Sequence, residues 1–175
     1  MKKIATLFMS LVLCLSCAFA VSAAQIPTPA EPILDGSYEL EGVNDGTFSW
    51  GTSGISPRVG VDGSFSFSFK IRLPSDLFTV TSNSVRITVT PTSKTGERFE
   101  LHVYECYKDL SGNVKEVKQM GNGYYMYDDG AIRYCDFSGF DTSKTYYMVM
   151  WKADNSKSVV GIGQIGSFGK VVDHI

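Results

Sequence analysis

The stretch that decides the fold is Ser64-Phe65-Ser66-Phe67-Ser68-Phe69-Lys70-Ile71-Arg72-Leu73, where polar and apolar side chains alternate without a break. Successive side chains of a β-strand point to opposite faces of its sheet. The phenylalanines, Ile71 and Leu73 would therefore face a core, and the serines, Lys70 and Arg72 would face water. The pattern predicts a half-buried strand with one wet side.

The same alternation recurs in residues 84–90, with Val85, Ile87 and Val89 inward, and in residues 98–107, with Phe99, Leu101 and Val103 inward. Turn-forming Asn-Gly and Asp-Gly combinations separate the segments, and no segment has a convincing helical period. This spacing predicts an all-β fold, an antiparallel β-sandwich of the immunoglobulin/fibronectin-like or jelly-roll-like kind. Further strands are expected at 46–50, 113–119, 131–137, 145–153 and 158–165, with shorter ones near 37–41, 124–127 and 168–172.

A local signature supports the sandwich. Phe140, Tyr146, Met148 and Met150 follow the pattern F-x5-Y-x-M-x-M, with a polar loop over residues 141–145. A large apolar residue six positions before a tyrosine that begins a strand resembles the tyrosine corner of immunoglobulin-like and fibronectin-type sandwiches. The resemblance covers about a dozen residues; it implies a sandwich and no particular activity.

The N-terminus has the pattern of an export signal. Met1-Lys2-Lys3 is followed by an apolar stretch over 4–15 and by small residues up to Ala24. We expect residues 1–24 to be a bacterial-type secretory signal peptide, which makes the protein secreted. The alternative is a membrane-anchored lipoprotein, acylated at Cys17 within Cys14-Leu15-Ser16-Cys17. No later segment is long and apolar enough to span a membrane.

The rest of the chain is expected to form one domain. Three prolines within residues 25–34 predict a stiff Pro-rich spacer, and residues 35–175 are predicted to form a single β-sandwich. Removal of the leader with Lys2 and Lys3 leaves 14 basic and 18 acidic side chains, a net charge of −4. An acidic surface argues against nucleic-acid binding, which depends on neutralising phosphates.

The two cysteines of the exported chain are Cys106 and Cys135. An even pair in an exported protein predicts one disulfide bond, and two buried free thiols are the competing interpretation. Their spacing, without a CxxC pair or a histidine pair, is not that of a zinc site.

Motifs for catalysis and for cofactors give mostly negative results. Gly161, Gly163 and Gly166 match the letters of a dinucleotide-binding fingerprint, but the flanking sequence is strand-like and predicts no helix to hold the phosphates. His102 is expected on the solvent side of its strand, and His174 at a frayed end. We therefore predict no catalytic residue and no cofactor.

Calcium is the metal worth weighing, because it needs only oxygen ligands. Two acidic segments could supply them, one at Asp128-Asp129 and one formed by Asp35, Glu39, Glu41, Asn44 and Asp45. Neither has the alternating ligands of a calcium loop, and Asp and Asn are common in turns. We favour plain turns and predict no metal site.

Exposed aromatic side chains suggest a binding face. If Tyr124 and Met126 face the core, Tyr125 and Tyr127 project outward beside carboxylates. Trp50, which precedes a glycine-rich loop, is a second candidate. Such rings stack on sugars or anchor protein partners; core or cross-strand packing is the alternative.

Trp151, in the strand predicted at 145–153, is expected to fill the core.

The export signal, the predicted sandwich and the exposed aromatic residues together predict a secreted, non-catalytic protein. Its role would be recognition or structure at the cell surface or outside, with a glycan or a protein as partner. The alternative is a small secreted hydrolase or hydrolase inhibitor, which a pocket gathering His102 with acidic side chains would favour.

Overall fold

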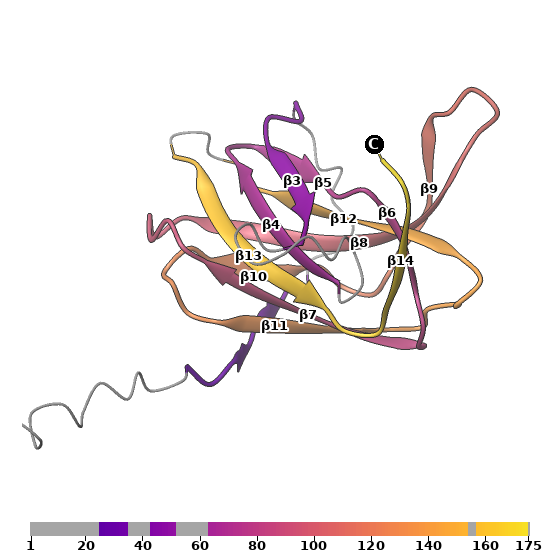
Figure 1. Ribbon diagram of the computed structural model, residues 1–175. Helices are drawn as coiled ribbons and strands as arrows, with labels where there is room; N and C mark the ends of the chain where they lie inside the picture. The colour runs from indigo at the N-terminus through magenta and orange to yellow at the C-terminus, as the bar shows by residue number, and fades with distance from the viewer. Residues whose placement is uncertain (1–24, 35–42, 52–62, 154–156, 175) are drawn as a thin grey trace, which may run out of the picture.

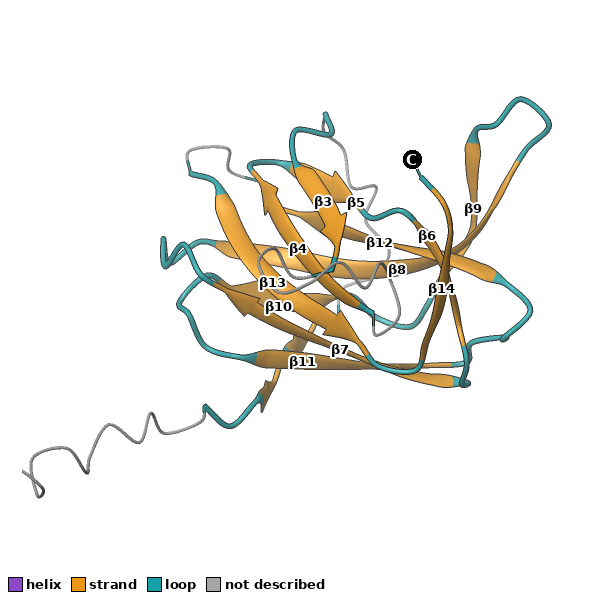
Figure 2. Ribbon diagram, in the orientation of Figure 1, coloured by secondary structure: helices purple, strands orange, loops and turns teal. Residues whose placement is uncertain are grey.

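The computed structural model describes residues 25–34, 43–51, 63–153 and 157–174. Strands and loops make up these ranges, and no helix occurs in them (Figure 2). No helix long and apolar enough to cross a membrane is found in the described parts of the chain. The predicted signal peptide and the predicted strand at 37–41 lie outside the described residues. The strands are β1 (Thr28–Pro29), β2 (Glu31–Pro32), β3 (Thr47–Trp50), β4 (Ser64–Phe69), β5 (Arg72–Pro74), β6 (Leu77–Val80), β7 (Ser84–Pro91), β8 (Arg98–Lys108), β9 (Val114–Gln119), β10 (Tyr124–Tyr127), β11 (Arg133–Ser138), β12 (Thr145–Trp151), β13 (Val159–Ile165) and β14 (Phe168–Asp173).

The strands form two packed sheets, which confirms the predicted β-sandwich (Figure 1). A six-stranded sheet has the order β1-β11-β7-β13-β4-β3. An eight-stranded sheet has the order β14-β6-β12-β8-β10-β2, with β5 paired to β12 and β9 paired to β8. From β10 to β14 each strand lies in the opposite sheet from the one before it, and from β4 to β8 the chain does the same except that β5 and β6 both belong to the eight-stranded sheet. The quartet β4-β13-β7-β11 opposite β6-β12-β8-β10 is the arrangement of a jelly roll rather than of an immunoglobulin domain.

The main core lies between the two sheets. Phe65, Phe67 and Phe69 of β4 are at most 3% exposed and face the core, as their alternation predicts. Val85, Ile87 and Val89 of β7 and Phe99, Leu101 and Val103 of β8 join them. Burial of these apolar side chains is the main source of stability for the sandwich.

The predicted ten-residue strand at 64–73 is broken in the structure. β4 ends at Phe69 in one sheet and β5 begins at Arg72 in the other. At the crossing, one carboxylate oxygen of Asp45 accepts hydrogen bonds from the backbone N–H groups of Lys70, Ile71 and Arg72, at 3.1, 2.9 and 3.3 Å. The Asp45 carboxylate thus satisfies backbone donors that have left the sheet ladder.

The predicted spacer also differs from what the structure has. Residues 28–29 form β1, parallel to β11, and residues 31–32 form β2, antiparallel to β10. Ala30 and Ile33 are 7% and 3% exposed. The N-terminal segment therefore connects one edge of each sheet, because prolines tolerate edge positions where no N–H is needed.

The tyrosine corner is confirmed. The Tyr146 hydroxyl donates to the carbonyl oxygen of Asp141 at 3.0 Å and accepts from the Asp141 N–H at 2.8 Å. The Phe140 ring meets the Tyr146 ring edge-on, with centroids 4.7 Å apart. This corner fixes the start of β12 and, through it, the side chains that β12 presents on each face.

Candidate binding face on the eight-stranded sheet

One row of aromatic and charged side chains crosses the outer face of the eight-stranded sheet. The pairing registers align Glu31 with Tyr125, Tyr125 with Glu100, Glu100 with Trp151, and Trp151 with Arg72. The five side chains come from β2, β10, β8, β12 and β5. We call this set the Tyr125–Trp151 row. It places one aromatic side chain on each side of the Glu100 carboxylate, Tyr125 on one side and Trp151 on the other.

The centre of this face is buried rather than wet. His102 is 1% exposed, and its Nε2 lies 3.0 Å from a carboxylate oxygen of Glu100, itself 8% exposed. His102 stands on the face opposite Phe99 and Leu101, as predicted, but its predicted solvent exposure is wrong. Gly123 has no side chain and so leaves room for the His102 imidazole, since a Cβ at position 123 would lie 2.3 Å from the His102 ring.

Two tyrosines continue the buried face beside His102. Tyr104 and Tyr147 pair across β8 and β12, with ring centroids 5.6 Å apart and nearly parallel planes. The Tyr147 hydroxyl donates to a carboxylate oxygen of Glu116 on β9. Burial, with the Glu116 and Glu100 carboxylates, raises the pKa of Tyr104 to about 12, and burial raises that of Tyr147 further. Both hydroxyls therefore stay protonated at neutral pH.

Tyr125 and Tyr127 project outward, as predicted, and both are partly exposed. Met126 and Tyr124 point the other way, into or against the core. The Arg98 guanidinium lies over the Tyr125 ring at 4.4 Å, and that of Arg133 lies 5.2 Å from the centroid of Tyr127. These contacts orient both rings at low cost in conformational entropy, because guanidinium and ring are planar.

The two tryptophans exchange their predicted places. Trp50 packs against the main core, edge-on to Phe65 and Phe78 and 4.8 Å from the ring of Phe168. Its position on β3, two residues after Phe48, puts it on the inner face, so we remove it from the candidate site. Trp151, predicted to fill the core, stands instead on the outer face of the eight-stranded sheet, against the cluster of Tyr147 and Val149.

The predicted Cys106–Cys135 disulfide is not formed: both cysteines are free thiols. Cys135 belongs to the main core between the sheets. Cys106 belongs to the second cluster, on the outer face of the eight-stranded sheet. The thiols thus lie on opposite sides of that sheet. Burial raises the pKa of both thiols, that of Cys106 to about 12, and so favours the protonated thiol over the nucleophilic thiolate.

The acidic segments serve as turn and loop braces where the structure describes them. The Asp128 carboxylate accepts from the hydroxyls of Ser93 and Thr95 and from the N–H groups of Lys94 and Thr95. Asp129 binds Arg133 through two oxygens, each at 2.7 Å. Asp35, Glu39 and Glu41 lie outside the described residues. Within the described ranges, no group of three or more His, Cys, Asp or Glu side chains could hold a metal ion.

The glycines of the fingerprint have a structural role. Gly161 and Gly163 face the core from β13, and a Cβ at either would lie 2.5 or 2.3 Å from the ring of Phe67 or Phe65. They let the phenylalanine rings lie against the backbone of the strand, as the strand-like flanking sequence suggests.

The chain matches no protein-family model and no curated protein sequence. Similar solved structures include the cupin domain of Drosophila melanogaster CENP-C, at 12% identity, 68% coverage of each chain and a TM-score of 0.32. A CBM28 carbohydrate-binding module specific for non-crystalline cellulose is 12% identical, with 83% of this chain and 97% of that chain covered and a TM-score of 0.34. The family 11 carbohydrate-binding module of Clostridium thermocellum is 14% identical, with 84% and 99% covered and a TM-score of 0.31. A likeness this distant says nothing about what this chain binds.

The sequence placed Tyr125 and Tyr127 on this outer face but did not place Trp151, Tyr104 and Tyr147 there. The segment 145–151 is apolar or aromatic on both faces, so alternation does not say which side meets the core. The pairing of β12 with β8 supplies that information, and only tertiary structure contains it.

Proposed function

We propose that this protein is a secreted, non-catalytic β-sandwich that binds carbohydrate through the outer face of its eight-stranded sheet. The observation that carries the proposal is the Tyr125–Trp151 row. Aromatic rings stack on the apolar faces of sugar rings, while carboxylate and guanidinium groups bond to sugar hydroxyls. The row supplies both kinds of contact in one line.

The spacing of the row suits an extended ligand. Neighbouring strands lie about 4.8 Å apart, so Tyr125 and Trp151, separated by β8, stand roughly 10 Å apart along the row. Glu100 lies between them and keeps its orientation through His102. The buried Tyr104–Tyr147 pair beside the row makes this part of the sheet a rigid support, which lowers the entropy cost of binding.

A binding role fits His102 better than the hydrolase alternative does. The structure brings His102 together with Glu100, and a histidine beside a carboxylate is the arrangement that would favour the hydrolase alternative. A general base, however, must come within hydrogen-bond reach of its substrate. His102 is 1% exposed and its Nε2 faces Glu100, so this pair supports the orientation of Glu100.

The test is binding of the purified exported chain to a panel of soluble neutral and acidic polysaccharides, by affinity electrophoresis and calorimetry. We expect Trp151→Ala and Tyr125→Ala each to weaken binding about tenfold or more, equivalent to about 1.4 kcal/mol. Tyr107→Ala is the matched control, because Tyr107 is also an exposed tyrosine, at 54% exposure, but lies near the far end of β8, outside the row. Equal loss in all three variants, or no binding to any glycan, would refute the proposal.

Export is part of the proposal and rests on the leader sequence. Intact mass of the protein from culture supernatant should show a soluble form that begins near Ala24 or Gln25. A membrane-bound form that begins at Cys17 and has added acyl mass would support the lipoprotein alternative instead.

A further inference from the structure

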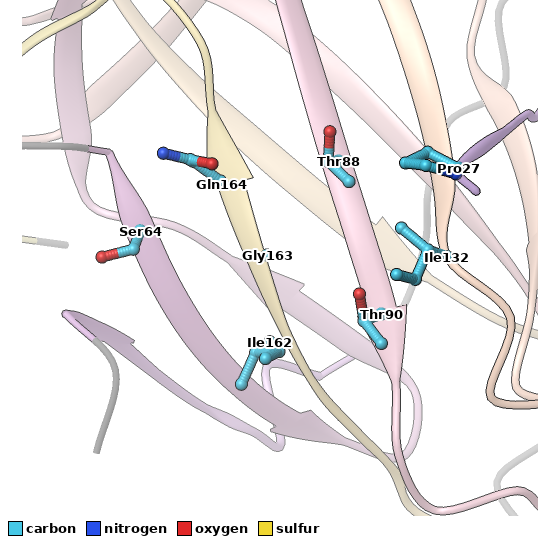
Figure 3. Close-up of a pocket in the computed structure, with 8 residues that line it drawn as sticks. All are labelled: Pro27, Ser64, Thr88, Thr90, Ile132, Ile162, Gly163 and Gln164. Atoms are coloured by element: carbon cyan, nitrogen blue, oxygen red, sulfur yellow. The ribbon is translucent and has the colours of Figure 1, made fainter. Parts of the chain in front are cut away.

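We propose that the protein has a second glycan site, on the outer face of the six-stranded sheet, so that one domain holds two sugar chains on opposite sides. The site is a shallow groove of about 390 Å³, lined chiefly by Pro27, Thr88, Thr90, Ile132, Ile162 and Gln164 (Figure 3). We call it the β7 groove. It shares no residue with the Tyr125–Trp151 row and rests on the proposed function only for the class of ligand.

The groove follows from the side chains of two neighbouring strands, β7 and β13, and of two residues that directly precede β11 and β1. Its floor is β7, where the short side chains of Thr88 and Thr90 point outward (Figure 3). Gln164 and Ile162 of β13 are the registered partners of these threonines and form one wall. The second wall comes from Ile132 and Pro27 (Figure 3). β7 is hydrogen-bonded on both sides, to β11 and β13, so the groove is pre-formed and binding need not order its floor.

The lining is uncharged and has two chemical parts. Ile132, Ile162 and Pro27 give apolar surface, and Ile162 is 44% exposed. Thr88 and Thr90 add hydroxyl groups and Gln164 adds an amide, each able to donate and to accept hydrogen bonds. A sugar ring, with apolar C–H faces and a rim of hydroxyls, matches both parts.

The charged side chain that follows the groove along β7 is already paired. At the next outward position of β7, Arg86 binds Asp136 through two hydrogen bonds of 2.7 Å, and its guanidinium lies over Tyr134. A charged ligand in the groove would lose water without gaining a counter-charge, which is unfavourable. The volume lies within the range of about 300–1,000 Å³ typical of ligand pockets. These features favour a neutral oligosaccharide.

The test is a methyl NMR titration with a neutral cello-oligosaccharide and a neutral xylo-oligosaccharide, with polygalacturonate as the acidic comparison. Methyl groups of Thr88, Thr90, Ile132 and Ile162 report on the groove, and those of Val149 report on the face that carries the Tyr125–Trp151 row. We expect saturable shifts of the groove methyls with a neutral sugar, retained in the Trp151→Ala variant.

A blocking variant and a matched control complete the experiment. Thr90→Arg should fill the groove and weaken binding of the sugar there at least tenfold, whereas Ser84→Arg, the same kind of change at an exposed position of the same strand outside the groove, should leave that binding unchanged. Shifts of Val149 alone would overturn the second site and leave the proposed function standing. Shifts of the groove methyls alone would do the reverse. If neither set of methyls shifts, the second site and the proposed function are both overturned. Equal shifts of the groove methyls with polygalacturonate would overturn the preference for a neutral ligand.

Discussion

The outer faces of the two sheets differ although β4 and β7 of one sheet and β8 of the other alternate in the same way. The six-stranded sheet presents serines, threonines and an Arg86–Asp136 pair that is more than half exposed. The eight-stranded sheet presents His102, Tyr104 and Tyr147, each at most 8% exposed. The comparison teaches that alternation tells which side of a strand meets the main core, but not whether the other side is wet.

The largest effect that sharpens this comparison is on stability. Tyr147→Ala should lower the free energy of unfolding by about 3–5 kcal/mol, as for other large buried aromatic side chains. Tyr147 is 3% exposed, stacks on Tyr104 and donates to Glu116. Tyr134→Ala, on the outer face of the six-stranded sheet, should cost about 0.5 kcal/mol. Urea unfolding measures both; similar losses would mean that the two faces do not differ.

A smaller effect is expected at the buried contact between His102 and Glu100. His102→Ala removes the partner of Glu100 and should cost about 1–3 kcal/mol, because a buried carboxylate is left without its hydrogen bond. Asp136→Ala breaks the exposed pair with Arg86 and should leave the unfolding midpoint almost unchanged, since surface ion pairs contribute little. An effect of Asp136→Ala as large as that of His102→Ala would contradict this account.

A pH dependence of stability is also expected, confined to the alkaline range. Burial, then Glu116 and Glu100, raise the pKa of Tyr104 to about 12, against about 10 in an unfolded chain. Stability from this group is therefore complete below pH of about 10 and is lost as pH rises toward 12. Unfolding measured across this range should show a shallower loss in Tyr104→Phe than in the wild type. Identical slopes would place Tyr104 in a wet environment.

For most strands, the sequence could predict which side chains face the core. Phe65, Val85, Phe99 and Met126 all face the core as alternation indicates, and the Phe140–Tyr146 corner formed where its spacing predicted. Both features are local: the alternation has a period of two residues, and Phe140 and Tyr146 are six residues apart, so a short stretch of sequence contains all the information.

What the sequence could not predict depends on distant pairings. The alternation of residues 64–73 continues through a crossing between sheets, because β4 and β5 each keep their own apolar side. The carboxylate that stabilises the crossing, Asp45, is 25 residues before its first donor, the backbone N–H of Lys70. Likewise, nothing near Cys106 or Cys135 indicates that a sheet separates them.

The two tryptophans give the most direct measurement of the central claim, that glycan binds on the Tyr125–Trp151 row. Since the chain has only two tryptophans, Trp50→Phe leaves Trp151 as the sole indole and Trp151→Phe leaves Trp50. Both variants are titrated with the polysaccharides that the wild type binds, while indole fluorescence is recorded and circular dichroism checks the fold. The account predicts a saturable change in emission for Trp50→Phe and none for Trp151→Phe. A change seen only in Trp151→Phe would place the ligand beside Trp50 and contradict the account.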